Sequence, residues 1–497
     1  MEDSLRIVGE YGTYQSHIKL ILLGCAFLTN IYSVQIDLML KFPNLIITSK
    51  DSSLINNNLF VNKYCDKEKY KIETDKNTEL KNWNYNFKFF CENEWYIKII
   101  YFSVLIGNLF GLIFFSSISD RIGREKVMKY SIIFSCFLHL NLLFCLNPFH
   151  LILINLLGGF NSFIFITSII CITELLPHES NGINIGIFNI IYQMYPIILY
   201  LFLHIFENWK ILFFCTSLCN AFLAYFIFIN FLESPHWLFS TGQKIKCLSV
   251  LDRIALYNGT LTRWNEYQKI HIEDANRFGR ASTNFTKLFN FELNSGEIEQ
   301  DYKGITIFDL FYLKSQKCII IKLFILVFFN AIFSCGILIV IKYKENYNNY
   351  FLFDDIHSLI LIFIFIIIIG IISGYFSDIL GRNIIIMFAG LFGSISFFIY
   401  NENKKEIYLD ISLICTQGIN TILLIYIPEN ISTPIRNTLC GWLFLEYKII
   451  QFIMEISYKN INKDIFNYCI TFSGFLIGFC LLYMEETLDK NIPDIIP

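Results

Sequence analysis

The stretch SSISDRIGREKVM, residues 116–128, gathers two acids, two arginines and a lysine directly behind the apolar run IIYFSVLIGNLFGLIFF. Such a group of charges after a run of bilayer-spanning length is typical of a membrane helix that leaves the lipid. The spacing recurs in GYFSDILGRN, residues 374–383. The shared pattern is Asp-x-x-Gly-Arg, formed by Asp120, Gly123 and Arg124 in the first copy and by Asp378, Gly381 and Arg382 in the second.

The composition agrees with a chain that lies in lipid. Of 497 residues, 55% are hydrophobic and only 16% are charged, which is more apolar than a soluble globular chain usually is. The net charge of −3 leaves no basic surface for nucleic acid, so we expect no nucleic-acid partner. The bilayer itself is the expected surrounding.

Twelve apolar runs have spanning length. They lie near residues 17–40, 96–117, 127–146, 149–174, 184–206, 210–232, 318–341, 356–376, 383–400, 407–427, 438–457 and 466–484. The first is longer than a signal-peptide core and lacks a cleavage pattern, so it is predicted to be a retained helix. The sequence therefore predicts an all-α membrane protein with twelve transmembrane helices.

Two polar segments interrupt the runs, and the loop that contains DRIGREKVMK is the short loop richest in Lys and Arg. Because basic loops favour the cytoplasm, this loop fixes the predicted orientation. The expected organisation is a cytoplasmic N-terminus (1–17), a first six-helix bundle (18–232) with an extracellular loop (42–95), a cytoplasmic loop (233–317), a second six-helix bundle (318–484) and a cytoplasmic tail (485–497).

A second pair of acids strengthens the repeat. Glu174 lies 54 residues after Asp120, at the end of the fourth run, and Glu429 lies 51 residues after Asp378, at the end of the tenth. The two halves are therefore predicted to be parallel six-helix pseudo-repeats that enclose a site near the bilayer midplane. The alternative, charges that merely end a helix at the interface, does not explain the doubled spacing.

These residues resemble the signature loop of the major facilitator superfamily, Gly-x-x-x-Asp-Arg-x-Gly-Arg-Arg/Lys. Ser116 stands at its first Gly and Glu125 where a basic residue is common. More narrowly, the chain resembles the organic ion transporter family, which holds organic cation, organic anion and carnitine transporters. The supporting motifs are VGEYGTYQ, FKFFCENEW, IYQM, ESPHWLFSTGQ, YIPENISTPIRNT and EETLDKNIPD, and ESPHWL is also shared with sugar porters.

The resemblance implies a gate that closes the cytoplasmic side. In this family the acid of the first loop faces the N-terminal end of the eleventh helix, where the helix dipole favours a negative charge. Arg124 is then expected to reach Glu174, and Arg382 to reach Glu429. The full set of predicted gating residues is Asp120, Arg121, Arg124, Glu174, Asp378, Arg382, Glu429 and Arg436. Charges that face water without a partner are the alternative.

The substrate is expected to meet polar groups in the eleventh span, because a charge inside the bilayer is costly and rarely idle. Lys448 lies twelve residues after Arg436, at the station where the family's cation transporters carry an acid and its anion and carnitine transporters a base. The predicted substrate-binding residues are Lys448, Gln193, Tyr192, Glu446 and Phe165. Pairing of Lys448 with Glu446 or Glu455 stays open as the alternative.

The outer segment contains two of the 15 cysteines, Cys65 and Cys91, and we predict a disulfide between them. The glycosylation sequons at Asn258 and Asn284 fall in the loop assigned to the cytoplasm and are expected to be unused.

No nucleotide-binding glycine loop, nucleophile elbow or metal-ligand spacing is present, so an enzyme, a cofactor and a metal are not expected. The predicted function is alternating-access transport of small organic ions, leaning to anions or zwitterions. An organic cation or sugar transporter of the same fold, and a receptor that binds a solute without moving it, are the alternatives. We expect a monomer in the plasma membrane, with a coupling ion left open.

Overall fold

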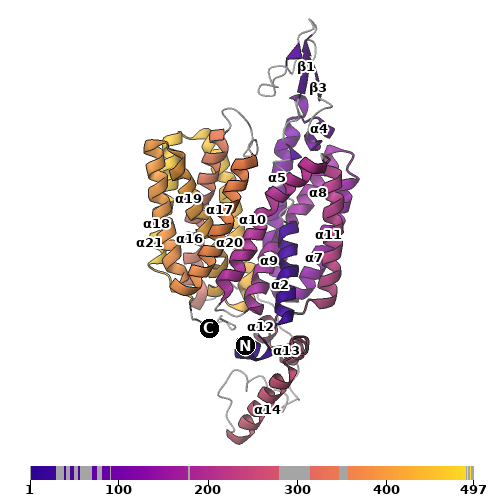
Figure 1. The fold of residues 1–497 in the computed structure, drawn as a ribbon, viewed down its shortest axis with the longest axis vertical. Helices are drawn as coiled ribbons and strands as arrows, with labels where there is room; N and C mark the ends of the chain where they lie inside the picture. The colour runs from indigo at the N-terminus through magenta and orange to yellow at the C-terminus, as the bar shows by residue number, and fades with distance from the viewer. Residues whose placement is uncertain are drawn as a thin grey trace.

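A computed structural model gives the fold of the chain (Figure 1). The residues that it describes are 2–9, 11–29, 39–40, 45–49, 54–55, 70–74, 81–89, 91–176, 180–206, 208–278, 314–345, 356–488, 490 and 493. Long helices dominate this part of the chain, and they form two groups that lie side by side (Figure 1).

Each group contains six spanning segments within the described residues. The first half consists of α2 (Thr13–Thr29), the continuous segment α5, η3 and α6 (Trp95–Ile122), α7 (Arg124–Leu143), the pair α8 (Pro148–Phe160) and α9 (Phe163–Leu175), α10 (Asn181–Phe206) and α11 (Trp209–Asn230). The second half consists of α16 (Lys314–Glu345), α17 (Ile356–Leu380), α18 (Arg382–Asn403), α19 (Glu406–Asn430), α20 (Arg436–Asn460) and α21 (Lys463–Leu481). The predicted architecture of two six-helix repeats is confirmed.

By length and composition alone, seven helical segments of the described chain are apolar enough to cross a membrane. They include the segment Trp95–Ile122, which ends in the first signature loop, and α18, which begins just after the second. Large apolar side chains on these helices face outward; Phe114, Phe222 and Phe388 are each at least half exposed. A belt of exposed aromatic and aliphatic side chains is what a bilayer covers.

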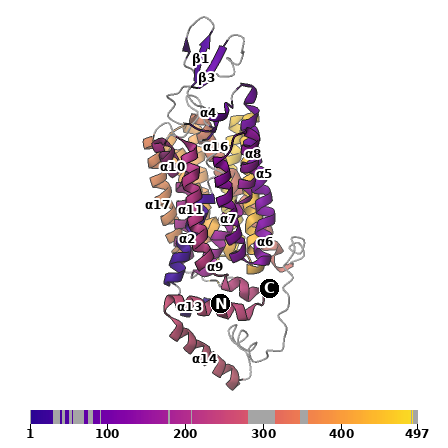
Figure 2. The ribbon, with the colours of Figure 1, turned by 90° about the vertical axis from the view of Figure 1, so that its right-hand side faces the viewer.

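The two ends of the helix bundle differ. Both chain termini and the short helices α12 (Pro235–Ser240) and α13 (Lys244–Asn258) lie at one end, which we call the terminal face, and α14 (Leu261–Phe278) extends beyond it (Figures 1 and 2). A three-stranded antiparallel sheet of order β2-β1-β3 stands at the opposite end. Its strands are β1 (Leu45–Ser49), β2 (Leu54–Ile55) and β3 (Tyr70–Thr74). The sheet is an addition to the predicted all-helical fold.

The outer segment is anchored on the first half through α4 (Trp83–Phe87). The Trp83 ring is fully buried, stacks on Phe213 with the ring centroids 6.2 Å apart, and meets Trp209 edge-on. Cys91 is disulfide-bonded in the structure. Cys65 lies outside the described residues, so its pairing with Cys91 stays a prediction.

Helix α1 (Glu2–Gly9) packs on α13 and α14 at the terminal face. Asn258, at the end of α13, fastens this contact, because its Nδ2 donates to the Val8 carbonyl at 3.1 Å and its Oδ1 accepts from the Tyr14 amide at 2.9 Å. The carboxamide of this sequon is therefore engaged with the N-terminal segment. Asn284 lies outside the described residues.

The two halves approach most closely where α10 crosses α17. A Cβ added to Gly182 would lie 2.4 Å from the Gly374 carbonyl oxygen, and one added to Gly186 would lie 2.6 Å from the carbonyl oxygen of Gly370. Both helices thus present glycines four residues apart, a spacing that lets helix backbones touch inside a membrane.

Candidate functional site

The two signature loops are sharp turns of the same form. Gly123 has φ of +110° and Gly381 has φ of +99°, a backbone conformation that favours glycine. Each turn ends one helix and begins the next, and a distant carboxylate accepts from the new helix's first amide. Glu233 accepts from the Arg124 amide at 2.8 Å, and Glu486 accepts from the Arg382 amide at 2.9 Å.

Glu233 and Glu486 were not among the predicted gating residues. The sequence did contain a signal for them: each lies just after the last helix of its half. A negative charge at a helix N-terminus is favourable, since the first amides there lack intrahelical partners. Burial opposes this gain and raises the pKa of Glu233 to about 7.

Buried ion pairs follow each turn, on the residues that the repeat predicts. In the first half, the Arg124 guanidinium lies 3.1 Å from Asp120 and 3.3 Å from Glu174. In the second half, the Arg382 guanidinium lies 3.3 Å from both Asp378 and Glu429. The Arg124 and Arg382 side chains are fully buried, so each cation depends on its two acids for charge compensation.

Asp120 also joins the two halves. Its Oδ2 accepts from the Thr438 amide and hydroxyl, each at 2.7 Å, and its Oδ1 accepts from the Asn437 amide at 3.3 Å. These groups form the first turn of α20, the eleventh spanning segment. The predicted placement of Asp120 at this helix end is what the structure shows.

Asp378 makes the matching contact in the opposite direction. Its carboxylate accepts from the amides of Gly182 at 3.0 Å and Ile183 at 3.1 Å, in the first turn of α10. Arg436 adds an ion pair between the halves, because its guanidinium lies 2.7 Å from Glu174. Together these contacts hold the halves against each other at the terminal face.

Arg121 behaves differently from the other predicted gating residues. Its side chain is exposed and forms no ion pair with any residue in the described part of the chain. The structure therefore gives Arg121 no part in the buried clusters.

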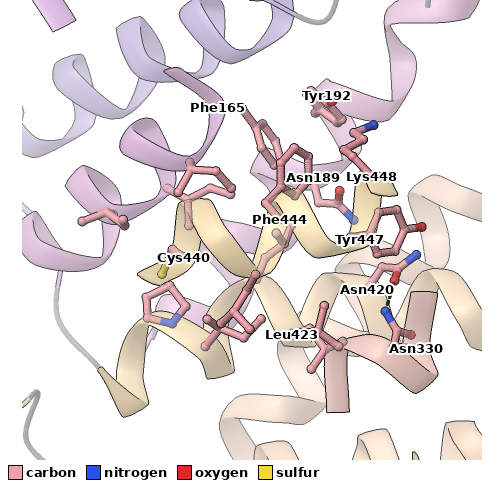
Figure 3. Close-up of a pocket in the computed structure, with 18 of the residues that line it drawn as sticks. Phe165, Asn189, Tyr192, Asn330, Asn420, Leu423, Cys440, Phe444, Tyr447 and Lys448 are labelled. Atoms are coloured by element: carbon pink, nitrogen blue, oxygen red, sulfur yellow. Dashed lines mark hydrogen bonds between the residues drawn. The ribbon is translucent and has the colours of Figure 1, made fainter. Parts of the chain in front are cut away.

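A cavity of about 390 Å³ lies between the two halves, on the inner side of these clusters (Figure 3). Its wall comes from α9, α10, α16, α19 and α20. Among its lining residues are four of the five predicted substrate-binding residues, Phe165, Tyr192, Gln193 and Lys448. Glu446 is not among them. The volume falls within the range of small-molecule sites.

Lys448 brings a positive charge to this cavity. Its Nζ lies 5.4 Å from the centre of the Phe444 ring, and in Figure 3 the side chain extends toward Tyr192. No carboxylate of the described chain lies within 4 Å of this ammonium. The alternative partner Glu455 pairs with Lys342 instead, at 3.0 Å.

Aromatic rings and amides form the rest of the wall. The Phe165 ring lies 4.1 Å from Tyr192 and 5.6 Å from Phe444, centre to centre. Asn330 donates to Asn420 at 2.8 Å on the second-half side (Figure 3). Phe444, Asn189, Asn330 and Asn420 were not predicted as lining residues. Phe444 is one of 52 phenylalanines, and the sequence alone does not indicate which asparagines face a cavity. No cluster of metal-ligating side chains occurs among the described residues.

Comparison with known proteins places this arrangement in a family. The sequence profile described as Major Facilitator Superfamily matches residues 94–401, which is more than half of the chain. The chain belongs to the major facilitator superfamily. It is accordingly a multi-pass integral membrane protein, and the predicted family resemblance is confirmed at this level.

Two curated relatives are members of solute carrier family 22. Member 2 from Pongo abelii is 26% identical over 178 residues, 35% of this chain and 31% of that protein. Member 23 from Rattus norvegicus is 24% identical over 186 residues, 35% of this chain and 27% of that protein. The matched region is thus less than a third of either relative's length. These matches agree with the expected organic ion transporter branch.

Solved structures share the fold across nearly the whole chain. The proton:xylose symporter XylE bound to 6-bromo-6-deoxy-D-glucose has a TM-score of 0.63 at 13% identity, covering 97% of this chain and 98% of that one. The human organic anion transporter MFSD10 has a TM-score of 0.57 at 12% identity, covering 94% and 99%. At these identities the likeness concerns the fold alone.

Proposed function

We propose that this major facilitator is a transporter of small organic ions that works by alternating access and prefers anions or zwitterions. The proposal rests on the position of Lys448. Its side chain lines the cavity between the halves, and no carboxylate of the residues that the structure describes lies within 4 Å of its ammonium. In a poorly solvated site, such a charge attracts a substrate anion and repels a cation.

The contacts at the terminal face support the alternating-access part. Asp120 and Asp378 each bind the first turn of a helix from the other half, and Arg436 pairs with Glu174 across the same seam. A cavity closed on this side can empty there only if these contacts break. They therefore contribute to the free-energy difference between the two access states.

The proposal places the terminal face in the cytoplasm of a plasma-membrane protein that acts as a monomer. Residues 1–17, 233–317 and 485–497 would then be cytoplasmic, and residues 42–95 extracellular. Matches to solute carrier family 22 proteins favour an organic ion as the substrate. No catalytic step is assigned to the chain.

The proposed contacts with substrate are the ammonium of Lys448, the amide of Gln193 and the rings of Tyr192 and Phe165, which line one cavity. The aromatic rings suit the apolar part of an organic anion, while the polar groups orient its charged end. Glu446 is left out of this set because it does not line the cavity.

Uptake into proteoliposomes that contain only this protein tests the proposal. Labelled benzoate and phenylalanine should enter faster than benzyltrimethylammonium or glucose, and Lys448→Gln should depress benzoate uptake at least tenfold. Preferred uptake of benzyltrimethylammonium would refute the anion assignment, and saturable binding of benzoate without uptake would identify a receptor.

A further inference from the structure

Two side-chain amides that line the cavity also hold the halves together. Asn189 and Gln193 lie one turn apart on α10 and line the cavity. The Asn189 Nδ2 donates to the Thr421 hydroxyl at 2.8 Å, and the Gln193 Nε2 donates to the Gln417 Oε1 at 3.4 Å. Thr421 and Gln417 lie one turn apart on α19, in the other half, and neither lines the cavity.

These two bonds, which we call the amide ladder, join α10 to α19 across the seam and lie beside the cavity, since the cavity lining on α19 continues past Thr421 to Pro428, nearer the terminal face. Asn189 is seven residues beyond Gly182, whose amide binds Asp378, and a helix rises 1.5 Å per residue, so about 10 Å separates the two contacts along α10. Because α10 and α19 belong to different halves, a movement that separates these two helices beside the cavity breaks the amide ladder. An opening of the terminal face that carries α10 away from the second half therefore breaks these bonds together with those of Asp378.

The amide ladder is open to competition from the cavity side. A neutral amide-to-hydroxyl bond is about half as strong as one to an ionised acceptor. Lys448 lines the same cavity and favours an anionic oxygen there. An anion held near Lys448 thus presents to Asn189 and Gln193 a better acceptor than the Thr421 hydroxyl or the Gln417 carboxamide.

We propose that Asn189 and Gln193 are specificity-determining residues that donate to the substrate's anionic oxygen and release Thr421 and Gln417 when they do so. Binding then loosens the seam next to the cavity, so occupancy promotes opening of the terminal face. The role of the amide ladder in closing the seam stands on the geometry alone, while its displacement by an anion rests on the proposed function.

Thr421→Val tests the ladder without touching the cavity lining. The valine has nearly the same volume but cannot accept, which leaves the buried Asn189 amide short of one hydrogen bond in the closed state. We expect ligand-free protein to label about fivefold faster at Cys440 with an impermeant thiol reagent applied to the terminal face, read by peptide mass spectrometry, because one hydrogen bond is worth roughly 1 kcal/mol. Cys440 lines the cavity and is only 5% exposed.

Thr416→Val is the matched control. Thr416 is on the same helix and is equally buried. Both hydroxyls donate to a carbonyl of their own helix, that of Thr416 to Leu413 at 2.7 Å and that of Thr421 to Gln417 at 2.9 Å, but only the Thr421 hydroxyl also accepts from Asn189. Thr421→Ser, which keeps the hydroxyl, should label at the wild-type rate. Equal labelling of Thr421→Val and Thr416→Val would overturn the ladder as a closing contact.

Benzoate separates the two parts of the proposal. It should raise Cys440 labelling of the wild type about fivefold, raise that of Thr421→Val much less, and bind Thr421→Val about fivefold more tightly. A wild type that transports benzoate while its labelling stays unchanged would refute the displacement and leave the proposed function standing. A wild type that neither binds nor transports benzoate would refute the anion assignment, and the ligand-free comparison would still decide the ladder.

Discussion

Replacing Asp120 by Asn should weaken the closed terminal face more than any single neutral hydrogen bond does. The carboxylate accepts three hydrogen bonds from the first turn of α20, two of them from Thr438 at 2.7 Å. The Asn amide keeps one acceptor oxygen, and its NH₂ group cannot accept from the other donors. Charge-assisted bonds are worth about 1.5–3 kcal/mol each, and a buried carboxylate at a helix N-terminus gains up to about 2 kcal/mol from the helix dipole.

Because the remaining oxygen can retain one bond to Thr438, we take the net loss as about 2–3 kcal/mol. Each 1.4 kcal/mol is tenfold in an equilibrium constant, so the open population should rise about 30- to 150-fold. Thr438→Val removes only the hydroxyl bond and should raise it about fivefold. The two variants thus predict a graded series from a single carboxylate.

The assay is the ratio of labelling at Cys440 to labelling at Cys318. Cys318 is exposed at the start of α16 and should label equally in all variants, so it corrects for reagent and protein amount. Glu125→Gln is the control variant, since Glu125 pairs with Lys129 on its own helix and does not reach the other half.

An unchanged ratio in Asp120→Asn, with the thermal unfolding midpoint preserved, would refute the reasoning. It would mean that Asp120 keeps these partners in both access states, so that its bonds do not distinguish closed from open. A ratio that rises equally in Glu125→Gln would show instead that loss of any acid near the loop loosens the face.

Three further outcomes are expected. Gly182→Ala should raise Cys440 labelling, because the new Cβ would lie 2.4 Å from the Gly374 carbonyl oxygen, whereas Gly418→Ala should not, since the nearest atoms there are 3.9 Å away. Mass spectrometry of unreduced protein should show Cys91 joined to Cys65; a peptide that joins Cys91 to any other residue would contradict this pairing. Burial raises the pKa of Glu233 to about 7, so its native form holds a proton that the unfolded chain has lost above about 4.5, and this contribution to stability fades as the pH rises from about 4.5 to 7. Glu233→Gln should flatten that part of the pH profile of the thermal unfolding midpoint, and an unchanged slope would contradict the assignment.

The doubled charges were predictable because lipid leaves a charge few options. A buried guanidinium requires acids, and the repeated spacing put Arg124 and Arg382 at matching stations before Glu174 and Glu429; the family resemblance then implied that each arginine reaches its acid. The spanning helices could also be predicted from the sequence, since a helix in lipid must satisfy its backbone groups internally and present apolar side chains to the lipid. Physical constraint and the resemblance of the signature loops together carried these predictions.

The contacts between the halves were less predictable, because much of their chemistry belongs to the backbone. Asp378 accepts from the amides of Gly182 and Ile183, and any residue other than proline supplies an amide. The amide ladder depends on which faces of α10 and α19 meet, and that follows from the packing of both halves. The strands β1, β2 and β3 were not predicted, because the polar composition of residues 42–95 indicated only a loop.

The two halves differ in how Glu174 and Glu429 are paired. Seven residues after Glu429 stands Arg436, whose guanidinium crosses to Glu174, whereas seven residues after Glu174 stands Asn181, which has no charge to offer Glu429. The Asn181 side chain is fully buried, and neither its Nδ2 nor its Oδ1 has a hydrogen-bond partner in the described chain. Glu174 therefore pairs with a guanidinium from each half. Glu429 pairs at 3.3 Å with the guanidinium of Arg382, which belongs to the same half as Glu429. Loss of the Glu174 charge thus acts on the closure between the halves, and loss of the Glu429 charge acts chiefly on the stability of the second half.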